Sequence, residues 1–204
     1  MAYSSIEFKN LESKYGEVST WAIWEHSKYR IMEKSVKCIA ENLTLLHSKY
    51  VLIGLNASRK IEGEKWNNFR GGRHDRKLKY ALNDTDLRGA YMTDLFKEIV
   101  NPKSVDFYNY IKTNGEFIMK NVLSFKQEMS DIRISPETTF IIWGTENSLT
   151  ARLYKQHFEI HFSDIKTIYH KHYSSRGFDK DWVESIWRTL RVDADFTKTK
   201  GLYN

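Results

Sequence analysis

Cysteine, proline and long apolar runs are scarce in this chain of 204 residues. The single cysteine, Cys38, excludes an internal disulfide and a zinc site built from cysteines, and it favours a reducing compartment. The longest apolar stretches, such as residues 51–55, are far too short to cross a bilayer, and the N-terminal residues lack the apolar core of a signal peptide. We therefore expect a soluble, cytoplasmic protein without a membrane partner.

Linkers and repeats are missing as well. Only two prolines occur, Pro102 and Pro136, and no Gly/Ser-rich segment or internal repeat divides the chain. Because domains contain roughly 150 residues, the length predicts one domain over residues 1–204. Hydrophobic residues make up 41% and charged residues 28%, which excludes a disordered chain. The 32 Lys and Arg residues exceed the 26 Asp and Glu residues, and the net charge of +6 suits a partner that carries phosphates.

Short apolar runs alternate with segments of helical periodicity. Four runs are typical of buried strands, at residues 49–56, 89–94, 138–144 and 166–170. The helical pattern occurs at residues 36–46, 73–82, 118–132, 149–153 and 183–190, the last with Asp179 as its N-cap. This alternation predicts an α/β fold with a mostly parallel sheet and helices on both faces. Ligands bind such sheets beyond the carboxyl ends of the strands, which here are residues 56–59, 93–97, 144–147 and 170–177.

Two kinds of site receive little support from these strand ends. Neither GxGxxG nor GxxxxGK[ST] occurs, so a nucleotide cofactor has no anchor, and residues 54–58 (GLNAS) can equally form a simple turn. His170 and His172 share one face of a strand and could hold zinc with Asp94, but no strong zinc spacing accompanies them. We expect neither a metal nor a cofactor.

A basic run follows the first strand. Residues 70–79 contain five Lys or Arg and one Asp, next to Trp66 and Phe69. Such a run can be a solvated helix face. Basic residues beside aromatic ones are also the combination that binds single-stranded nucleic acid or an extruded base.

These segments, in this order, resemble the uracil-DNA glycosylase superfamily. Residues 54–58 (GLNAS) resemble the G-[IM]-N-P-G motif of its mismatch-specific and single-strand-selective branches, and residues 172–176 (HYSSR) resemble their H-P-S-P-[LR] motif. Residues 90–97 (AYMTDLFK) resemble the middle strand that ends in T-N-x-x-K. Residues 141–144 (IIWG) resemble the strand and glycine between the outer motifs. The resemblance extends from Val51 to about Leu190.

The resemblance implies a three-layer α/β/α fold with a mostly parallel, four-stranded central sheet. It implies hydrolysis of the N-glycosidic bond of a damaged or deaminated base flipped from DNA. DNA is then the partner, and neither a cofactor nor an obligatory protein partner is needed.

The resemblance also implies roles for individual residues. Asn56 would position the attacking water, and His172 would stabilise the charge that develops on the departing base. Phe69, or alternatively Trp66, would stack on that base, and Asp94 would face its edge. Arg176 would enter the base stack. Contacts with DNA are expected from Ser58, Arg70, Arg73, Arg76, Ser174 and Ser175.

Three departures from the motifs leave other functions open. Ala57–Ser58 replaces Pro-Gly, and Tyr173 replaces a proline. Asp94 replaces an asparagine; an ionised Asp only accepts hydrogen bonds, so it faces uracil O4 poorly and suits the N4 amino group of cytosine better. One alternative is a non-catalytic nucleic-acid-binding relative with the same fold. Another is an α/β enzyme acting on a small nucleotide or nucleoside.

Overall fold

The structure is a computed structural model that describes residues 2–57, 63–97, 99–100 and 103–202. In these residues, five strands form one mixed sheet in the order β1-β3-β2-β4-β5. Strands β3, β2, β4 and β5 are parallel, and β1 joins β3 in the antiparallel sense. The strands are β1 Thr20–Trp21, β2 His47–Asn56, β3 Ala90–Phe96, β4 Thr139–Trp143 and β5 Lys166–His170. The predicted α/β class is therefore confirmed.

The predicted four-stranded sheet needs a correction, because the four expected strands are joined by β1. This strand has only two residues, Thr20 and Trp21, which pair with Met92 and Tyr91. Two residues are too few to show the alternation by which a strand is recognised in a sequence.

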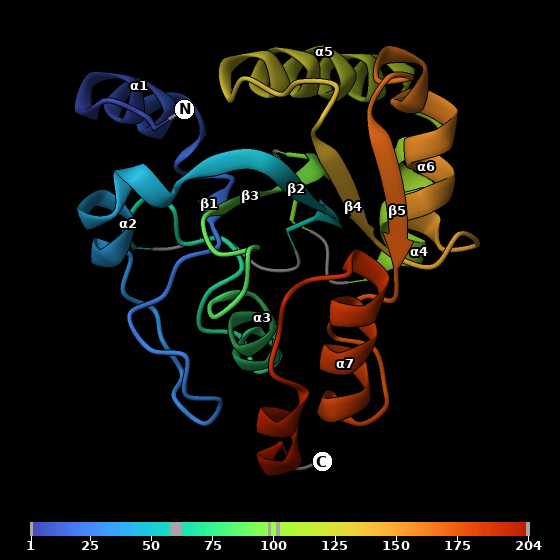
Figure 1. Ribbon diagram of the computed structural model, residues 1–204. Coiled ribbons are helices and arrows are strands. Elements are labelled where there is room, and N and C mark those ends of the chain that lie inside the picture. The colour runs from blue at the N-terminus through green and yellow to red at the C-terminus, as the bar shows by residue number, and fades with distance from the viewer. Residues whose placement is uncertain (1, 58–62, 98, 101–102, 203–204) are drawn as a thin grey trace.

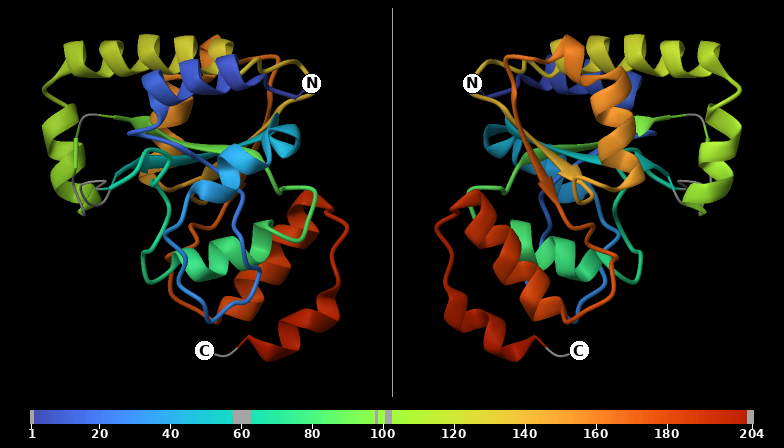
Figure 2. Two further views of the ribbon diagram at one scale, coloured as in Figure 1. Left: turned by 90° about the vertical axis from the view of Figure 1, so that its left-hand side faces the viewer. Right: turned by 90° about the vertical axis from the view of Figure 1, so that its right-hand side faces the viewer.

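Helices cover both faces of the sheet (Figures 1 and 2). One face carries α1 Ser5–Tyr15, α5 Gly115–Asp131 and α6 Leu149–His157, and the other carries α3 Asp75–Leu82 and α7 Asp179–Leu190. Shorter elements fill the edges: α2 Lys37–Glu41, α4 Ser104–Ile111 and the 3₁₀ turns η1 Leu43–Leu45, η2 Glu159–His161 and η3 Phe196–Gly201. None of the helices in the described residues combines the length and the apolar character needed to span a bilayer.

The helix predicted over residues 36–46 is confirmed only in its first half. The segment forms α2 and then η1, with a break at Asn42, whose φ of −129° and ψ of 42° are not helical. The Asn42 side chain donates to the carbonyl oxygen of Cys38 at 2.8 Å. Asparagine offers the backbone such local alternatives to a helix, which apolar spacing does not reveal.

Side-chain hydrogen bonds mark the starts of three helices. Ser4 and Glu7 form a capping box at α1, and Asn114 and Ser148 cap α5 and α6. At α7 the prediction of Asp179 as the N-cap is wrong: Phe178 is the N-cap residue and Asp179 is the first helical residue. The Asp179 carboxylate instead contacts side chains from other segments.

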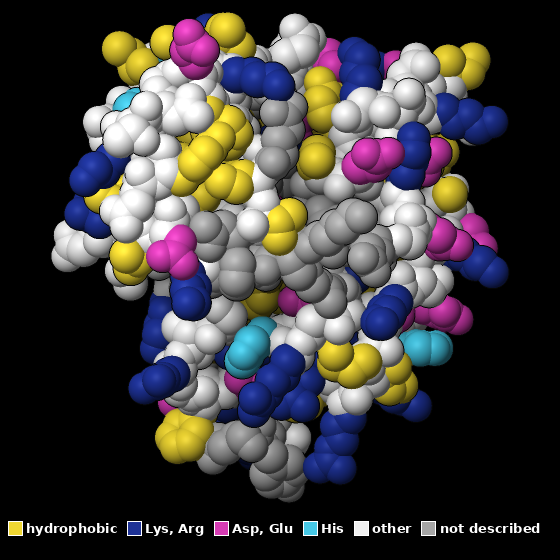
Figure 3. Space-filling view, turned by 180° about the vertical axis from the view of Figure 1, so that it is seen from behind, with side chains coloured by type: hydrophobic (Ala, Val, Ile, Leu, Met, Phe, Trp, Pro, Cys, Tyr) yellow, Lys and Arg dark blue, Asp and Glu magenta, His cyan; other side chains and the backbone are white. Residues whose placement is uncertain are grey.

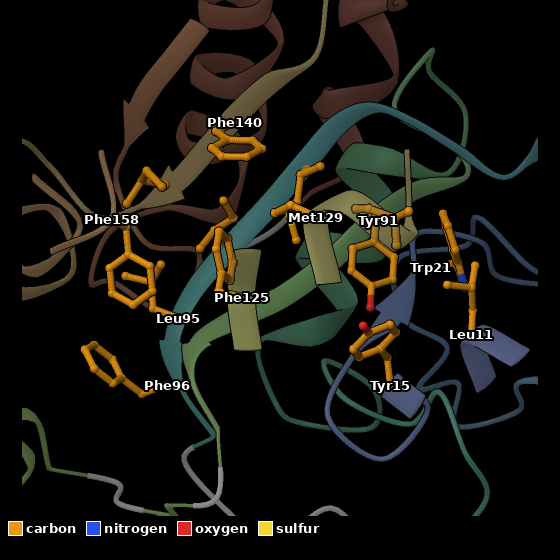
Figure 4. Close-up of a cluster of buried hydrophobic side chains, with 14 of the residues drawn as sticks. Leu11, Tyr15, Trp21, Tyr91, Leu95, Phe96, Phe125, Met129, Phe140 and Phe158 are labelled. Atoms are coloured by element: carbon orange, nitrogen blue, oxygen red, sulfur yellow. The ribbon is translucent and has the colours of Figure 1, made fainter. Parts of the chain in front are cut away.

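Two apolar clusters hold the layers together, one on each face. The first packs α1, α5 and α6 onto the sheet through aromatic pairs, among them Phe125 with Phe140 and Phe158 (Figure 4). The second packs α3 and α7 onto the other face around Trp143 and Trp182. Alternation along β2 and β4 divides their buried residues between the two clusters, since successive side chains point to opposite faces.

The strand order defines one place where a ligand would bind. The chain passes from the central strand β2 outward to β3, then crosses back to β4 and β5 on the other side. The connection therefore reverses between β2 and β4. In open α/β sheets the crevice beyond the carboxyl ends at such a reversal is the usual ligand site. Asn56 ends β2 and Gly144 follows β4 at this point.

Candidate functional site

An aromatic cluster lies at the carboxyl edge of β4 and β5, on the face covered by α3 and α7. We call Trp143, His170, Tyr173 and Trp182 the aromatic wall. The Trp143 ring centroid lies 6.0 Å from that of Tyr173 and 5.7 Å from that of Trp182, and His170 packs edge-on against both tryptophans. Phe69 extends the wall, with its ring 6.4 Å from that of Tyr173. The wall thus continues from β5 to the loop that precedes α3.

His172 lies against this wall, stacked on Tyr173 with ring centroids 4.5 Å apart. Its Nδ1 accepts a hydrogen bond from the backbone N–H of Ser174 at 3.0 Å, and Ser174 Oγ lies 2.8 Å from the same nitrogen. A backbone N–H can only donate, so Nδ1 carries no proton. A neutral His172 therefore has its proton on Nε2, which is a hydrogen-bond donor.

The surroundings keep His172 neutral. The pKa of His172 is lowered to about 4, mainly by burial and to a smaller extent by His74 and Lys77. Lys77 is itself buried beneath the wall, where its Nζ lies 2.8 Å from Asp179 Oδ1 and 5.6 Å from the Trp182 ring centroid. At neutral pH the site consequently presents an uncharged N–H donor, held in one orientation by Ser174.

Gly54 allows Asp94 and Phe69 to meet over strand β2. A Cβ atom on Gly54 would lie 2.1 Å from Oδ1 of Asp94 and 3.5 Å from Cε1 of Phe69. Any side chain here would collide with the carboxyl group, so the glycine is needed for this close approach. Two of the three predicted base-binding residues, Phe69 and Asp94, are therefore brought together at one place.

Asp94 is a buried carboxyl group, with 4% of the residue exposed. Burial raises the pKa of Asp94 to about 6, and a hydrogen bond from Asn68 opposes this rise. Lys97 also opposes it, whereas Glu128 adds to it. Lys97 Nζ donates to the backbone oxygen of Asp94 at 2.9 Å and pairs with Glu128 Oε2 at 2.5 Å. The carboxyl group of Asp94 thus changes protonation close to physiological pH.

Asn56, the predicted water-positioning residue, ends β2 two residues after Gly54. Its Nδ2 donates to the carbonyl oxygen of Ala57 at 3.0 Å, which orients the amide. In the pairing of β2 with β3, Asn56 lies beside Phe96, whose ring belongs to the first apolar cluster. Ser58, predicted to contact DNA, lies outside the described residues.

Two predicted site residues are structural instead. Arg70 is 1% exposed, and its guanidinium donates to the carbonyl oxygens of Trp21, Ile23 and Ser35. Because all these acceptors are inside the protein, the predicted DNA contact of Arg70 is wrong. Trp66 is also 1% exposed. It lies in the first apolar cluster, on the other side of the sheet from the aromatic wall, so its predicted stacking on a base is wrong as well.

The remaining predicted DNA contacts lie at or near the surface. Arg73, Ser174 and Arg176 are exposed. Arg76 is half-buried over the Tyr29 ring, with its guanidinium carbon 4.9 Å from the ring centroid. Ser175 is half-buried and donates to the carbonyl oxygen of His172 at 2.6 Å. Figure 3 shows Lys and Arg side chains and a histidine gathered on the lower half of the face toward which β2 and β3 run.

A zinc site does not assemble from the two histidines that follow β5. The nitrogens of His170 lie 3.1 Å from the carbonyl oxygen of Lys171 and 2.9 Å from Ser185 Oγ, and the residue is buried. Across the described ranges, no group of three or more His, Cys, Asp or Glu side chains is arranged to hold a metal ion.

The structure adds site residues that the sequence pattern did not identify. Asn68 contacts both Asp94 and Phe69, and Tyr173 contacts both Phe69 and His172. Tyr173 stood out in the sequence only as a replaced proline, and nothing in the sequence distinguished Asn68. Comparison with models of known protein families, with curated proteins and with solved structures finds no match.

Proposed function

We propose that this protein binds a nucleobase extruded from DNA and hydrolyses its N-glycosidic bond. The observation that carries the proposal is the neutral His172, whose Nε2–H is oriented by Ser174 at the carboxyl edge of the sheet. A neutral imidazole of this kind stabilises negative charge on a departing base through its N–H hydrogen bond. Preorganised donors of this kind are commonly the largest single contribution to catalysis.

In the proposed reaction, Asn56 orients a water molecule toward C1′ of the deoxyribose. The electron pair of the N-glycosidic bond moves to the base, and the water oxygen forms the new bond to C1′. His172 Nε2–H donates to a base oxygen that gains charge, and the proton released by the water passes to solvent or to the base. Phe69 would stack on the base, and Asp94 would face its edge.

Exposed groups around the site support a DNA substrate. Arg73 and Arg176 are exposed, and Ser174 offers a hydroxyl group from the same loop as His172. Half or more of the hydrogen bonds between proteins and DNA go to phosphates and sugars, and residues of these types make them. The net charge of +6 favours the same partner.

The test is an incubation with oligonucleotides that carry uracil, hypoxanthine, xanthine or a mismatch, followed by alkaline cleavage at abasic sites. The wild type should produce abasic sites from at least one of them. Asn56→Ala and His172→Ala should each slow the reaction by about 100- to 1000-fold, since each removes a preorganised group. The matched control is His161→Ala at an exposed histidine, which should leave the rate unchanged. Cleavage by both Asn56→Ala and His172→Ala at the wild-type rate would refute the proposal.

A second candidate is a non-catalytic protein that binds nucleic acid through the same surface. Tyr173 favours it, because this ring packs against Phe69 and Trp143 and stacks on His172. This ring covers part of Phe69, the residue proposed to stack on the base, so it would have to move before a base could enter. Salt-dependent DNA binding without abasic-site formation on any of these substrates would select this candidate.

A further inference from the structure

The Asn68 side chain joins three segments of the protein beneath the site. Its Nδ2 donates to the carbonyl oxygen of Val18 at 2.9 Å and to Oδ2 of Asp94 at 3.0 Å. Its Oδ1 accepts from the backbone N–H of Phe69 at 2.9 Å. The residue is 8% exposed, so water cannot readily replace these bonds.

These partners permit one orientation of the amide. The Val18 carbonyl can only accept and the Phe69 N–H can only donate, so Nδ2 and Oδ1 cannot exchange places. Both amide hydrogens are then in use, and Oδ2 of Asp94 must act as an acceptor. When the Asp94 carboxyl group is protonated, Oδ1 is the favoured position of the proton, because a carbonyl oxygen is a better acceptor than a hydroxyl oxygen; Oδ1 is the atom beside Gly54 and the Phe69 ring.

Phe69 has an unusual backbone conformation at this point. Its φ is 59°, in the left-handed region that bulky residues rarely adopt. Residues held in such conformations persist only where surrounding contacts fix them, and they occur preferentially at functional sites. The bond from the Phe69 N–H to Asn68 Oδ1 is one such contact.

We propose that Asn68 is a positioning residue that sets both the aromatic and the polar side of the base site, an inference that rests on the proposed function. It fixes the backbone of Phe69, and it holds the Asp94 carboxyl group with Oδ1 over Gly54 and beside the Phe69 ring, where the edge of a bound base would have to enter. An ionised Oδ1 accepts from an amino group or a ring N–H. The site therefore favours bases that present a donor on this edge, and a protonated Oδ1 favours a carbonyl instead.

Two charged groups act on Asp94, one just beyond the end of its own strand and one on a helix. Lys97 follows β3 and favours the ionised form, whereas Glu128 on α5 opposes it. Lys97 and Glu128 form an ion pair with each other. A change in either residue therefore also alters the effect of the other on the pKa of Asp94. Asn68 remains the group that touches the carboxylate itself.

The first measurement is the ¹³C NMR titration of the Asp94 carboxyl carbon, with its signal identified through Asp94→Asn. The wild-type midpoint should lie at about 6. Asn68→Ala should raise it by about one pH unit, because the ionised form loses a hydrogen bond. Asn68→Asp keeps the size and the acceptor for Phe69 but places a second carboxylate beside Asp94, so the midpoint should rise further. Asn83→Ala, at an asparagine that is also buried but is bonded to Trp24, should leave it unchanged.

The second measurement compares binding of a single-stranded oligonucleotide with a central cytosine, uracil or hypoxanthine against one with an abasic analogue. The wild type should prefer a base over the abasic analogue. Asn68→Ala should reduce that preference by about tenfold, the equivalent of one base–aromatic stacking contact, without changing affinity for the abasic oligonucleotide. An unchanged Asp94 midpoint in both Asn68 variants would overturn the role of Asn68. A wild type without any base preference would overturn the proposed function, while the titration would still decide the link between Asn68 and Asp94.

Discussion

Acid should destabilise this protein through His172, and the structure sets the size of the effect. In the folded protein the pKa of His172 is about 4, against an ordinary value of 6.5. The unfolded chain therefore binds more protons between these two values. The contribution of the neutral imidazole to the free energy of unfolding is fully present above about pH 7. It is lost as the pH falls from 6.5 toward 4.

At pH 5 this difference in proton binding amounts to about 2 kcal/mol for one imidazole. His170 has a similarly low pKa of about 4, caused by burial, so the wild type should lose about twice as much. Replacing His172 by glutamine removes one of the two contributions. His172→Gln should therefore lose about 2 kcal/mol less than the wild type between pH 8 and pH 5.

Urea unfolding at pH 8 and pH 5 measures this difference directly, from the free energies of unfolding of the two proteins. His161→Gln, at an exposed histidine, is the control and should show the acid sensitivity of the wild type. If His172→Gln loses as much stability as the wild type, the imidazole is not held neutral. The inference that burial keeps this imidazole uncharged, on which the proposed chemistry rests, would then be refuted.

Four further predictions concern surface charge, a buried arginine, base recognition and packing. Arg73→Ala with Arg176→Ala should weaken DNA binding for all sequences and flatten its salt dependence; unchanged affinity and slope would show that these residues do not contact DNA. By contrast, Arg70→Met should lower the free energy of unfolding by about 3 kcal/mol, measured by urea denaturation, because buried carbonyls lose their donor. Asp94→Asn should change which base is bound or excised, since an amide both donates and accepts; identical preferences would place Asp94 outside the site. Gly54→Ala should destabilise the fold by about 1–3 kcal/mol through collision with the Asp94 carboxyl group, and a smaller loss in Gly54→Ala/Asp94→Ala than in Gly54→Ala alone would identify that contact.

Local signals in the sequence determined most of the parallel strands and the edge at which the site lies. The predicted strand at residues 166–170 coincides with β5, and the predicted runs at 49–56 and 138–144 overlap β2 and β4. A strand buried on both faces requires a continuous apolar run, so it is visible in a short window of sequence. Parallel strands also place their carboxyl ends at one edge, which is why residues 56 and 170–177 could be assigned to that edge before the fold was known.

Contacts between distant segments decided the rest. Arg70 and Arg73 belong to one basic run, yet Arg70 is buried because the carbonyls of Trp21, Ile23 and Ser35 surround it, whereas Arg73 is exposed. The low pKa of His172 likewise depends on burial and on charges about a hundred residues earlier in the chain. A run of charged residues or a motif residue can be recognised in a short window of sequence. Its burial depends on which segments pack around it, and only the tertiary structure determines that packing.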